Sequence, residues 1–337
     1  MKLKKKEQQI ELLRTDSLYT SARVESQQTK LDKQDAERNM FLVAGALLIL
    51  MIGSVTYAFL QIRRRNKLIS AQKKKVEQQK RIIETKSKDI TDSIRYAEGI
   101  QKSILPTVKQ VKRMLPDSFI WFKPKDIVSG DFYWVAENND KVYFAVCDCT
   151  GHGVPGSLMS VVGTYLLNEA VNIKGISHPA DIFEEVRREL KISLKQEGLE
   201  GEQRDGMDAV LCAWDKNNKL EFAVAYNPLF HIRNGELMET KPDKQPVGFH
   251  NIEEKPYAHH ELTLEKGDTI YLFSDGYVDQ FGGPREKKFM MKNFKKLLLS
   301  IQDKTMNEQK DILETTMAEW KGSTEQVDDI LVMGLQF

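Results

Sequence analysis

The longest uninterrupted apolar segment of the chain covers residues 41–60, with the sequence FLVAGALLILMIGSVTYAFL, and contains no charged side chain. As a helix it would be about 30 Å long, which matches the hydrocarbon core of a membrane. A signal peptide has a shorter apolar region nearer the N-terminus, and a buried helix of a soluble core would not be flanked by long polar stretches. The pattern therefore predicts a permanent transmembrane helix at residues 40–61.

Basic residues flank this predicted helix unequally. The C-terminal flank contains Arg63, Arg64, Arg65, Lys67, Lys73, Lys74, Lys75 and Lys80, whereas a similar window before the helix contains Arg23, Lys30, Lys33 and Arg38. The positive-inside rule then predicts a single-pass protein of the inner (cytoplasmic) membrane with its C-terminal part in the cytoplasm. The polar, predicted helical segment 1–39 would face outward, although the lysines at positions 2, 4, 5 and 6 weaken the asymmetry.

Apolar residues recur every seven positions after the membrane segment, at Ile69, Val76, Ile83, Ile90, Ala97 and Ile104. Such a repeat is typical of a coiled coil and predicts a parallel homodimer through a linker helix at residues 62–105. The second core position of the heptads is mostly polar: Gln72, Gln79, Lys86 and Ser93. A weak seam of this kind suits a helix pair that changes its packing to carry a signal. A solvated single helix is the alternative.

The remaining residues, 106–337, are predicted to form a globular domain. Short apolar runs predict strands at 119–122, 132–136, 142–147, 209–214, 220–225, 229–233, 269–273 and 330–335. Longer runs predict helices at 156–171, 180–196, 286–301 and 307–321. The helices come in blocks and turn signals separate neighbouring strands, which favours antiparallel sheets covered by helices over a doubly wound parallel sheet.

Composition excludes some classes of function. The chain has 50 basic and 49 acidic residues and a formal net charge of +1, so its total charge gives no argument for a nucleic-acid partner. The three cysteines, Cys147, Cys149 and Cys212, are too few for a disulfide framework and lack the second pair that a zinc site requires. Cys147 and Cys149 alternate along a predicted strand, which indicates packing rather than redox chemistry.

Four aspartates occur in short motifs beside predicted strands or glycines: Asp131 in SGDF, Asp148 in DCTGHG, Asp275 in SDG and Asp328 in VDDI. Mg²⁺ and Mn²⁺ prefer carboxylate oxygens, and carboxylates from separate strand ends can build a two-metal site that activates a water molecule. The pattern indicates phosphoester hydrolysis. Each aspartate taken alone is equally typical of a turn residue that bonds its own backbone.

Longer motifs resemble a known family. The runs GDFYW at 130–134 and DCTGHGVPG at 148–156 are followed by DGMD at 205–208, NPL at 227–229, QPVG at 245–248, FSDGYVD at 273–279 and QVDDI at 326–330. This series is similar to the signature of the SpoIIE-type metal-dependent Ser/Thr protein phosphatases, a branch of the PPM superfamily that includes RsbU-like regulators. The resemblance covers roughly residues 89–337, including a helix similar to the linker of membrane-bound members.

The resemblance implies an α+β fold: a four-layer α/β/β/α sandwich with metals at one end, here preceded by a transmembrane helix and a coiled-coil linker helix. It also implies that Asp131, Asp148, Asp275 and Asp328, with the backbone carbonyl of Cys149, bind two Mn²⁺ or Mg²⁺ ions, and that Asp148 bridges them. A water activated by the metals would attack phosphorus in line, without a phosphoenzyme.

Several roles stay open. His152 either donates a proton to the leaving oxygen, as a catalytic residue beside Asp148, or only positions its Gly-His-Gly turn. Asp205 and Asp208 either hold a further metal or, slightly favoured, have a structural role. Many eukaryotic relatives hold the substrate phosphate with an arginine; none can be assigned here, and the candidates are Lys123 and Lys125.

The predicted function is that of a membrane-anchored phosphatase that acts on phosphoserine or phosphothreonine. By resemblance, its substrate would be a partner-switching phosphoprotein of the anti-sigma-factor antagonist type. One alternative is a catalytically silent or partner-activated scaffold, which the loss of a metal aspartate would favour. Another is a nucleotide cyclase of similar layout, but the sequence contains neither a Gly-Gly-Asp/Glu-Glu-Phe motif nor a phosphate-binding GxxxxGK loop.

Overall fold

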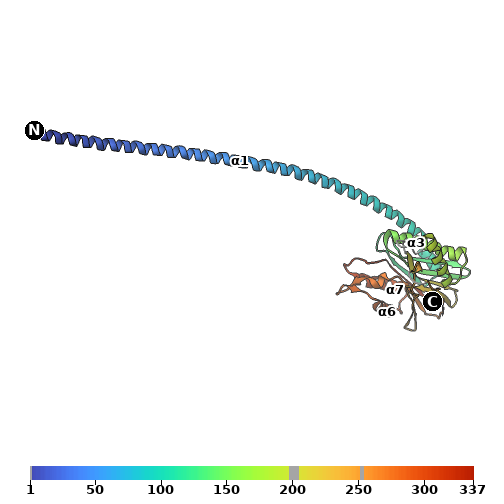
Figure 1. Cartoon of the computed structure of the whole chain (residues 1–337). Coiled ribbons are helices and arrows are strands. Elements are labelled where there is room, and N and C mark those ends of the chain that lie inside the picture. Colours follow the sequence, from blue (N-terminus) through green and yellow to red (C-terminus); the bar gives the residue numbers. More distant parts are fainter. Residues whose placement is uncertain (1, 197–204, 251–253) are drawn as a thin grey trace. The chain divides into compact units, whose positions relative to one another are not determined.

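The computed structural model describes residues 2–196, 205–250 and 254–337 (Figure 1). The described residues divide into two compact units, which lie within the bounds Met1–Ser87 and Lys88–Phe337. The first consists of helix α1 (Lys2–Ile104), whose last turns belong to the second unit. In the described part of the chain, one helix is long and apolar enough to cross a membrane by length and composition.

Helix α1 exposes the heptad positions that predict a coiled coil. Ile69, Val76, Ile83 and Ile90 are all exposed in the single chain. An apolar stripe of this kind is buried when a second helix packs on it. Dimerisation through α1 and the membrane crossing both stay predictions.

Two antiparallel sheets make up the second unit. The first has the order β2-β3-β4-β5-β9, with β8 paired to β4: β2 (Phe132–Asn138), β3 (Lys141–Cys149), β4 (Gly206–Trp214), β5 (Lys219–Ala225), β8 (Val247–Gly248) and β9 (His260–Thr263). The second has the order β1-β13-β10-β6-β7: β1 (Ser118–Lys123), β6 (Leu229–Arg233), β7 (Glu236–Thr240), β10 (Thr269–Phe273) and β13 (Ile330–Gln336). A separate hairpin joins β11 (Phe281–Gly282) to β12 (Lys287–Lys288).

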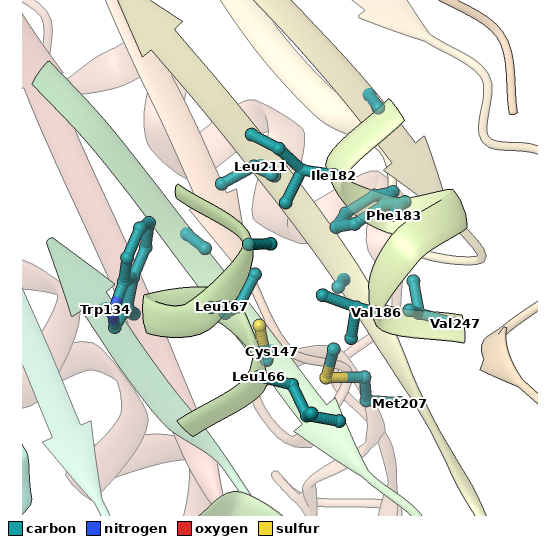
Figure 2. Packing of buried hydrophobic residues seen from close by; sticks show 14 of the residues in the cluster. Trp134, Cys147, Leu166, Leu167, Ile182, Phe183, Val186, Met207, Leu211 and Val247 are labelled. Carbon is teal, nitrogen blue, oxygen red and sulfur yellow. The ribbon is translucent and has the colours of Figure 1, made fainter. Parts of the chain in front are cut away.

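Alternating side chains of the strands create three buried layers. In β3, Ala145 and Cys147 face helices, whereas Phe144 and Val146 face the second sheet. Helices α3 (Gly153–Asn168) and α4 (Pro179–Ser193) cover the first sheet, and Figure 2 shows their side chains packed on it. Helices α6 (Met291–Ser300) and α7 (Met306–Lys321) cover the second. The α/β/β/α sandwich is therefore confirmed.

Shorter helices complete the unit. A π-helical turn, η1 (Glu169–Ile173), continues α3, and α2 (Val108–Met114) precedes β1. Helix α5 (Gly276–Asp279) follows β10. The starts of α2 and α7 are fixed by capping boxes, Thr107 with Gln110 and Thr305 with Glu308, in which each hydroxyl accepts from the third backbone N–H.

Most predicted elements are present, but the start of one helix was predicted wrongly. The helix predicted from residue 286 begins at Met291, because Lys287 and Lys288 pair with Phe281 and Gly282 in the β11–β12 hairpin. The backbone φ of 74° at Met290 also interrupts any helix there. The polar run from Glu286 has good helix propensity, and the tertiary pairing overrides it.

Candidate active site

Four carboxylates from both sheets line one pocket of about 180 Å³. Asp148 is near the end of β3, and Asp208 of β4 lies directly opposite it in the strand register. Asp275 follows β10 at the start of α5, and Asp328 precedes β13. Among the residues that the structure describes, 149–152 also line this pocket. The pocket thus lies where the ends of the two sheets meet.

Asp131 lies next to this pocket, directly before β2. Its side chain is buried, at 2% exposure, and lies close enough to the side chains of Asp148 and Ser274 to be affected by both. Its Oδ2 is buried without a hydrogen-bond partner among the described residues. A buried carboxylate oxygen without a partner is costly, and a bound cation would remove that cost.

The pKa values of these carboxyl groups are raised together. Burial, and then the charge of a neighbouring aspartate, raises the pKa values of Asp131 and Asp148 well above the ordinary range. Burial and the charge of Asp275 raise the pKa of Asp208 to about 7. Burial and the charge of Asp328 raise the pKa of Asp275 to about 6. These carboxyl groups oppose one another's ionisation, and a bound divalent cation would offset that repulsion. Their oxygens are the ligands that Mg²⁺ and Mn²⁺ prefer.

The adjacent residues Asp328 and Asp329 have different surroundings. Asp329 is buried; its Oδ1 accepts from the backbone N–H of Lys125 at 2.7 Å, and its Oδ2 accepts from that of Gly130 at 2.8 Å. Asp328 lines the pocket. The side chain of Asp329 therefore holds the segment before Asp131 in place, whereas that of Asp328 is available to the site.

Glycines allow the DCTGHG loop to lie against its neighbours. A Cβ added at Gly130 would be 2.4 Å from the carbonyl oxygen of Gly151, and one added at Gly156 would be 2.1 Å from it. Gly151 itself has a φ of +83°, which favours glycine. These contacts bring the backbone of residues 149–152 to the pocket.

His152 is in contact with two charged side chains at the edge of the pocket. Its Nδ1 lies 2.8 Å from Oδ2 of Asp126, and its Nε2 lies 3.1 Å from Nζ of Lys125. The side chains of His152 and Asp126 are about half exposed. Lys123, by contrast, lines a different groove, beside α2 and α7.

The structure places Asp148, Asp275 and Asp328 in one pocket, with Asp131 beside it. Asp208, for which a structural role was slightly favoured, lines the same pocket. Asp205 contributes a backbone carbonyl that accepts from Gln196, and it does not line the pocket. The thiol of Cys149 is buried in the core beneath α3, so only its backbone is available to the site. The DGMD motif was the available signal for Asp208, but its pairing with Asp148 depends on strand register.

Comparison with known proteins gives a family match. Residues 138–337 match the family model of stage II sporulation protein E (SpoIIE). The solved SiaA-PP2C domain of Pseudomonas aeruginosa is 33% identical and superposes with a TM-score of 0.67 over 74% of this chain and 98% of that domain.

Two further relatives come from Bacillus subtilis. Phosphoserine phosphatase RsbU (strain 168) is 22% identical over 191 residues, which cover 57% of this chain and 55% of RsbU, so the chain spans about half the length of that relative. A solved structure of the PP2C phosphatase domain and a regulatory fragment of SpoIIE is 21% identical, with a TM-score of 0.53, over 65% of this chain and 62% of that one. The latter likeness concerns the fold alone.

Proposed function

Because this chain belongs to the stage II sporulation protein E family, as its resemblance to SpoIIE-type phosphatases predicted, we propose that it is a metal-dependent protein Ser/Thr phosphatase. We propose further that residues 40–61, within helix α1, anchor it in a membrane. One observation carries the phosphatase proposal: the carboxylates of Asp148, Asp208, Asp275 and Asp328 line one pocket, beside the buried Asp131. Every metal aspartate that the resemblance implies is present, so no observation favours a silent scaffold.

Asp131, Asp148, Asp275 and Asp328, with the carbonyl of Cys149, would hold two Mn²⁺ or Mg²⁺ ions. The unpartnered Oδ2 of Asp131 and the raised pKa values support this donor set. When bound, such ions supply a nucleophilic water near neutral pH and neutralise the phosphoryl oxygens. Asp208, which faces Asp148 across the β3–β4 pair, would be a further ligand.

Asp148 is our proposed bridging carboxylate because the other acidic groups surround it. It lies next to Asp131, and its ionisation is opposed by burial and by the charges of Asp275, Asp208 and Asp328. A carboxylate that lies between Asp131 and the other three aspartates could contribute an oxygen to each of two cations. By holding the cations rigidly it would fix the position of the phosphoryl group for in-line attack.

The remaining parts of the chain would serve anchoring and regulation. We propose that residues 40–61 cross the inner membrane once, that residues 1–39 lie outside, and that residues 62–105 pair as a coiled coil in a homodimer. The apolar stretch and the exposed heptad residues of α1 support this. The phosphatase domain, 106–337, would then be cytoplasmic.

Likeness to phosphoserine phosphatase RsbU supports a phosphoserine substrate. We propose a partner-switching regulator of the anti-sigma-factor antagonist type. The test is hydrolysis by the full chain, in detergent micelles, of matched peptides that contain phosphoserine, phosphothreonine or phosphotyrosine. Release from the first two, abolished by a chelator, supports the proposal. Equal release from the phosphotyrosine peptide contradicts the assigned substrate class.

A further inference from the structure

The described lining of the carboxylate pocket contains neither a lysine nor an arginine. Of its described lining residues, those with ionisable side chains are Asp148, Asp208, Asp275 and Asp328, together with His152 and the buried Cys149. A phosphorylated side chain brings close to two negative charges to this pocket. A positively charged side chain at the edge would stabilise the bound phosphoryl group.

The backbone of Lys125 is fixed beside the pocket. Its N–H donates to Oδ1 of Asp329 at 2.7 Å, while Oδ2 of the same carboxylate accepts from Gly130 N–H at 2.8 Å. One buried carboxylate thus holds both ends of the segment 125–130. Asp329 directly follows Asp328 of the pocket, so the backbone of Lys125 is held next to the acidic cluster.

The side chain of Lys125 points to His152, which lines the pocket. A lysine ammonium has only hydrogens to donate, so at 3.1 Å the Nε2 of His152 must accept. The hydrogen of the neutral imidazole is then on Nδ1, from which it is donated to Oδ2 of Asp126 at 2.8 Å. In this arrangement Nε2 has no hydrogen to give to a leaving oxygen. The geometry therefore favours a positioning role for His152.

Two other lysines are less suitable. Lys123 lines the groove beside α2 and α7. Lys288 lies close enough to Asp275 to affect its pKa, but its Nζ is 2.6 Å from Oδ2 of Asp279. Among the described residues, no carboxylate is within ion-pair distance of Nζ of Lys125, whose polar partner is the imidazole Nε2 of His152. Its charge and its two other hydrogens are therefore available to an anion.

We infer that Lys125 binds the phosphoryl group of the substrate, and that His152 and Asp126 position its ammonium. The ligand class is a phosphomonoester dianion, and inorganic phosphate, the product, has the same chemistry. This inference rests on the proposed phosphatase function and names the phosphate-binding residue that the sequence left undecided. Lys125 would be a binding residue of the reaction, whereas His152 would act through it.

The experiment measures binding of inorganic phosphate to the full chain in detergent micelles with Mg²⁺, by calorimetry. In parallel it measures KM and kcat for a phosphoserine peptide. Lys125→Ala is expected to weaken phosphate binding and to raise KM about tenfold or more, because a charge-assisted hydrogen bond is lost. Lys125→Arg should retain most of the affinity. The matched control, Lys123→Ala, should bind phosphate as the wild type does.

A third variant separates the positioning role from direct binding. Asp126→Asn removes the charge that holds the Nδ1 hydrogen of His152, so phosphate binding should weaken less than in Lys125→Ala while kcat changes little. Equal phosphate affinity in the wild type and in folded Lys125→Ala, or no phosphate binding by the wild type, overturns the inference. Phosphate binding that depends on Lys125 without any turnover keeps the inference and rejects the phosphatase function instead.

Discussion

The side-chain amide of Gln101, three residues before the end of α1, forms a two-way hydrogen-bonded pair with the backbone of Ser129. Its Nε2 donates to the Ser129 carbonyl at 2.6 Å, and its Oε1 accepts from the Ser129 N–H at 3.1 Å. Nε2 also lies 2.8 Å from the hydroxyl of Ser160 in α3. The last turn of α1 is therefore attached to the segment that carries Asp131.

Gln101→Ala removes these bonds and leaves the Ser129 N–H and carbonyl buried without partners. We expect the second unit to lose about 1–3 kcal/mol of stability, and Mn²⁺ to be bound more weakly because Asp131 is less well held. Thermal unfolding and a Mn²⁺ titration of activity measure both effects. Lys102→Ala is the control, since that exposed side chain bonds only to Glu98 among the described residues. Identical results for the two variants would contradict this coupling.

Asp148→Asn should separate stability from metal binding. It removes a carboxyl group whose ionisation is opposed by burial and by the charges of Asp275 and Asp208. The variant without metal should therefore unfold at a higher temperature than the wild type without metal, whereas added Mg²⁺ should no longer raise the unfolding temperature. Differential scanning fluorimetry with and without Mg²⁺ measures both changes. Asp303→Asn, at an exposed carboxylate paired with Lys304, is the control. If the metal-free variant were less stable than the metal-free wild type, the carboxyl groups would not destabilise one another as proposed.

The stabilisation by Mg²⁺ should depend on pH. The pKa of Asp208 is raised to about 7 and that of Asp275 to about 6, so the folded protein without metal binds more protons than the unfolded chain between pH of about 4 and 7. Its stability then falls as the pH rises through this range. Bound cations favour the ionised carboxylates, so saturating Mg²⁺ should raise the unfolding temperature more at pH 7.5 than at pH 5.5. An equal rise at both pH values would contradict the raised pKa values.

Replacing Asp328 or Asp329 by asparagine should affect different properties of the protein. Asp329→Asn places an NH₂ group opposite one of two backbone N–H donors, so the unit should lose about 2–3 kcal/mol of stability. Asp328→Asn should keep the stability and lower the affinity for Mn²⁺. Chemical denaturation and a Mn²⁺ titration distinguish the two. A stable Asp329→Asn protein with impaired metal binding would indicate that Asp329, and not Asp328, is the metal ligand.

The coiled coil predicts a specific pattern of cross-linking. Ile83→Cys places a thiol on the heptad stripe, whereas Arg81→Cys places one on the opposite side of the same turn. Cys147, Cys149 and Cys212 are buried and should not compete. Mild oxidation of membranes should yield covalent dimers from the first variant and few from the second. Equal cross-linking of both would indicate random collision rather than a parallel helix pair.

Much of the fold could be predicted because the central strands are continuous apolar runs. In β3, Phe144 and Val146 belong to one buried layer and Ala145 and Cys147 to another, so a strand covered on both faces reads directly from its apolar run. Strands β7 and β9 were missed because they lie at sheet edges and are rich in polar residues, which give no apolar pattern.

The site was predicted only in part, because sequence motifs show local features and do not show which distant segments pack together. Asp131, Asp148, Asp275 and Asp328 stand in local motifs that the sequence displays. The facing position of Asp208 depends on the β3–β4 register, and the contact of Lys125 with His152 joins two loops. Neither relationship has a local signal, since both arise from how distant segments pack.

Phosphoester hydrolysis by the carboxylate cluster, with divalent cations, can be tested on the whole chain. The most direct measurement is phosphate release from a phosphoserine peptide by the full chain in detergent micelles, with Mn²⁺, with Mg²⁺ and with a chelator, beside Asp148→Asn. We predict release that requires the metal and falls at least about a hundredfold in the variant. Release that persists in the chelator or in the variant, or no release by the wild type in any condition, would contradict metal-dependent hydrolysis at Asp148.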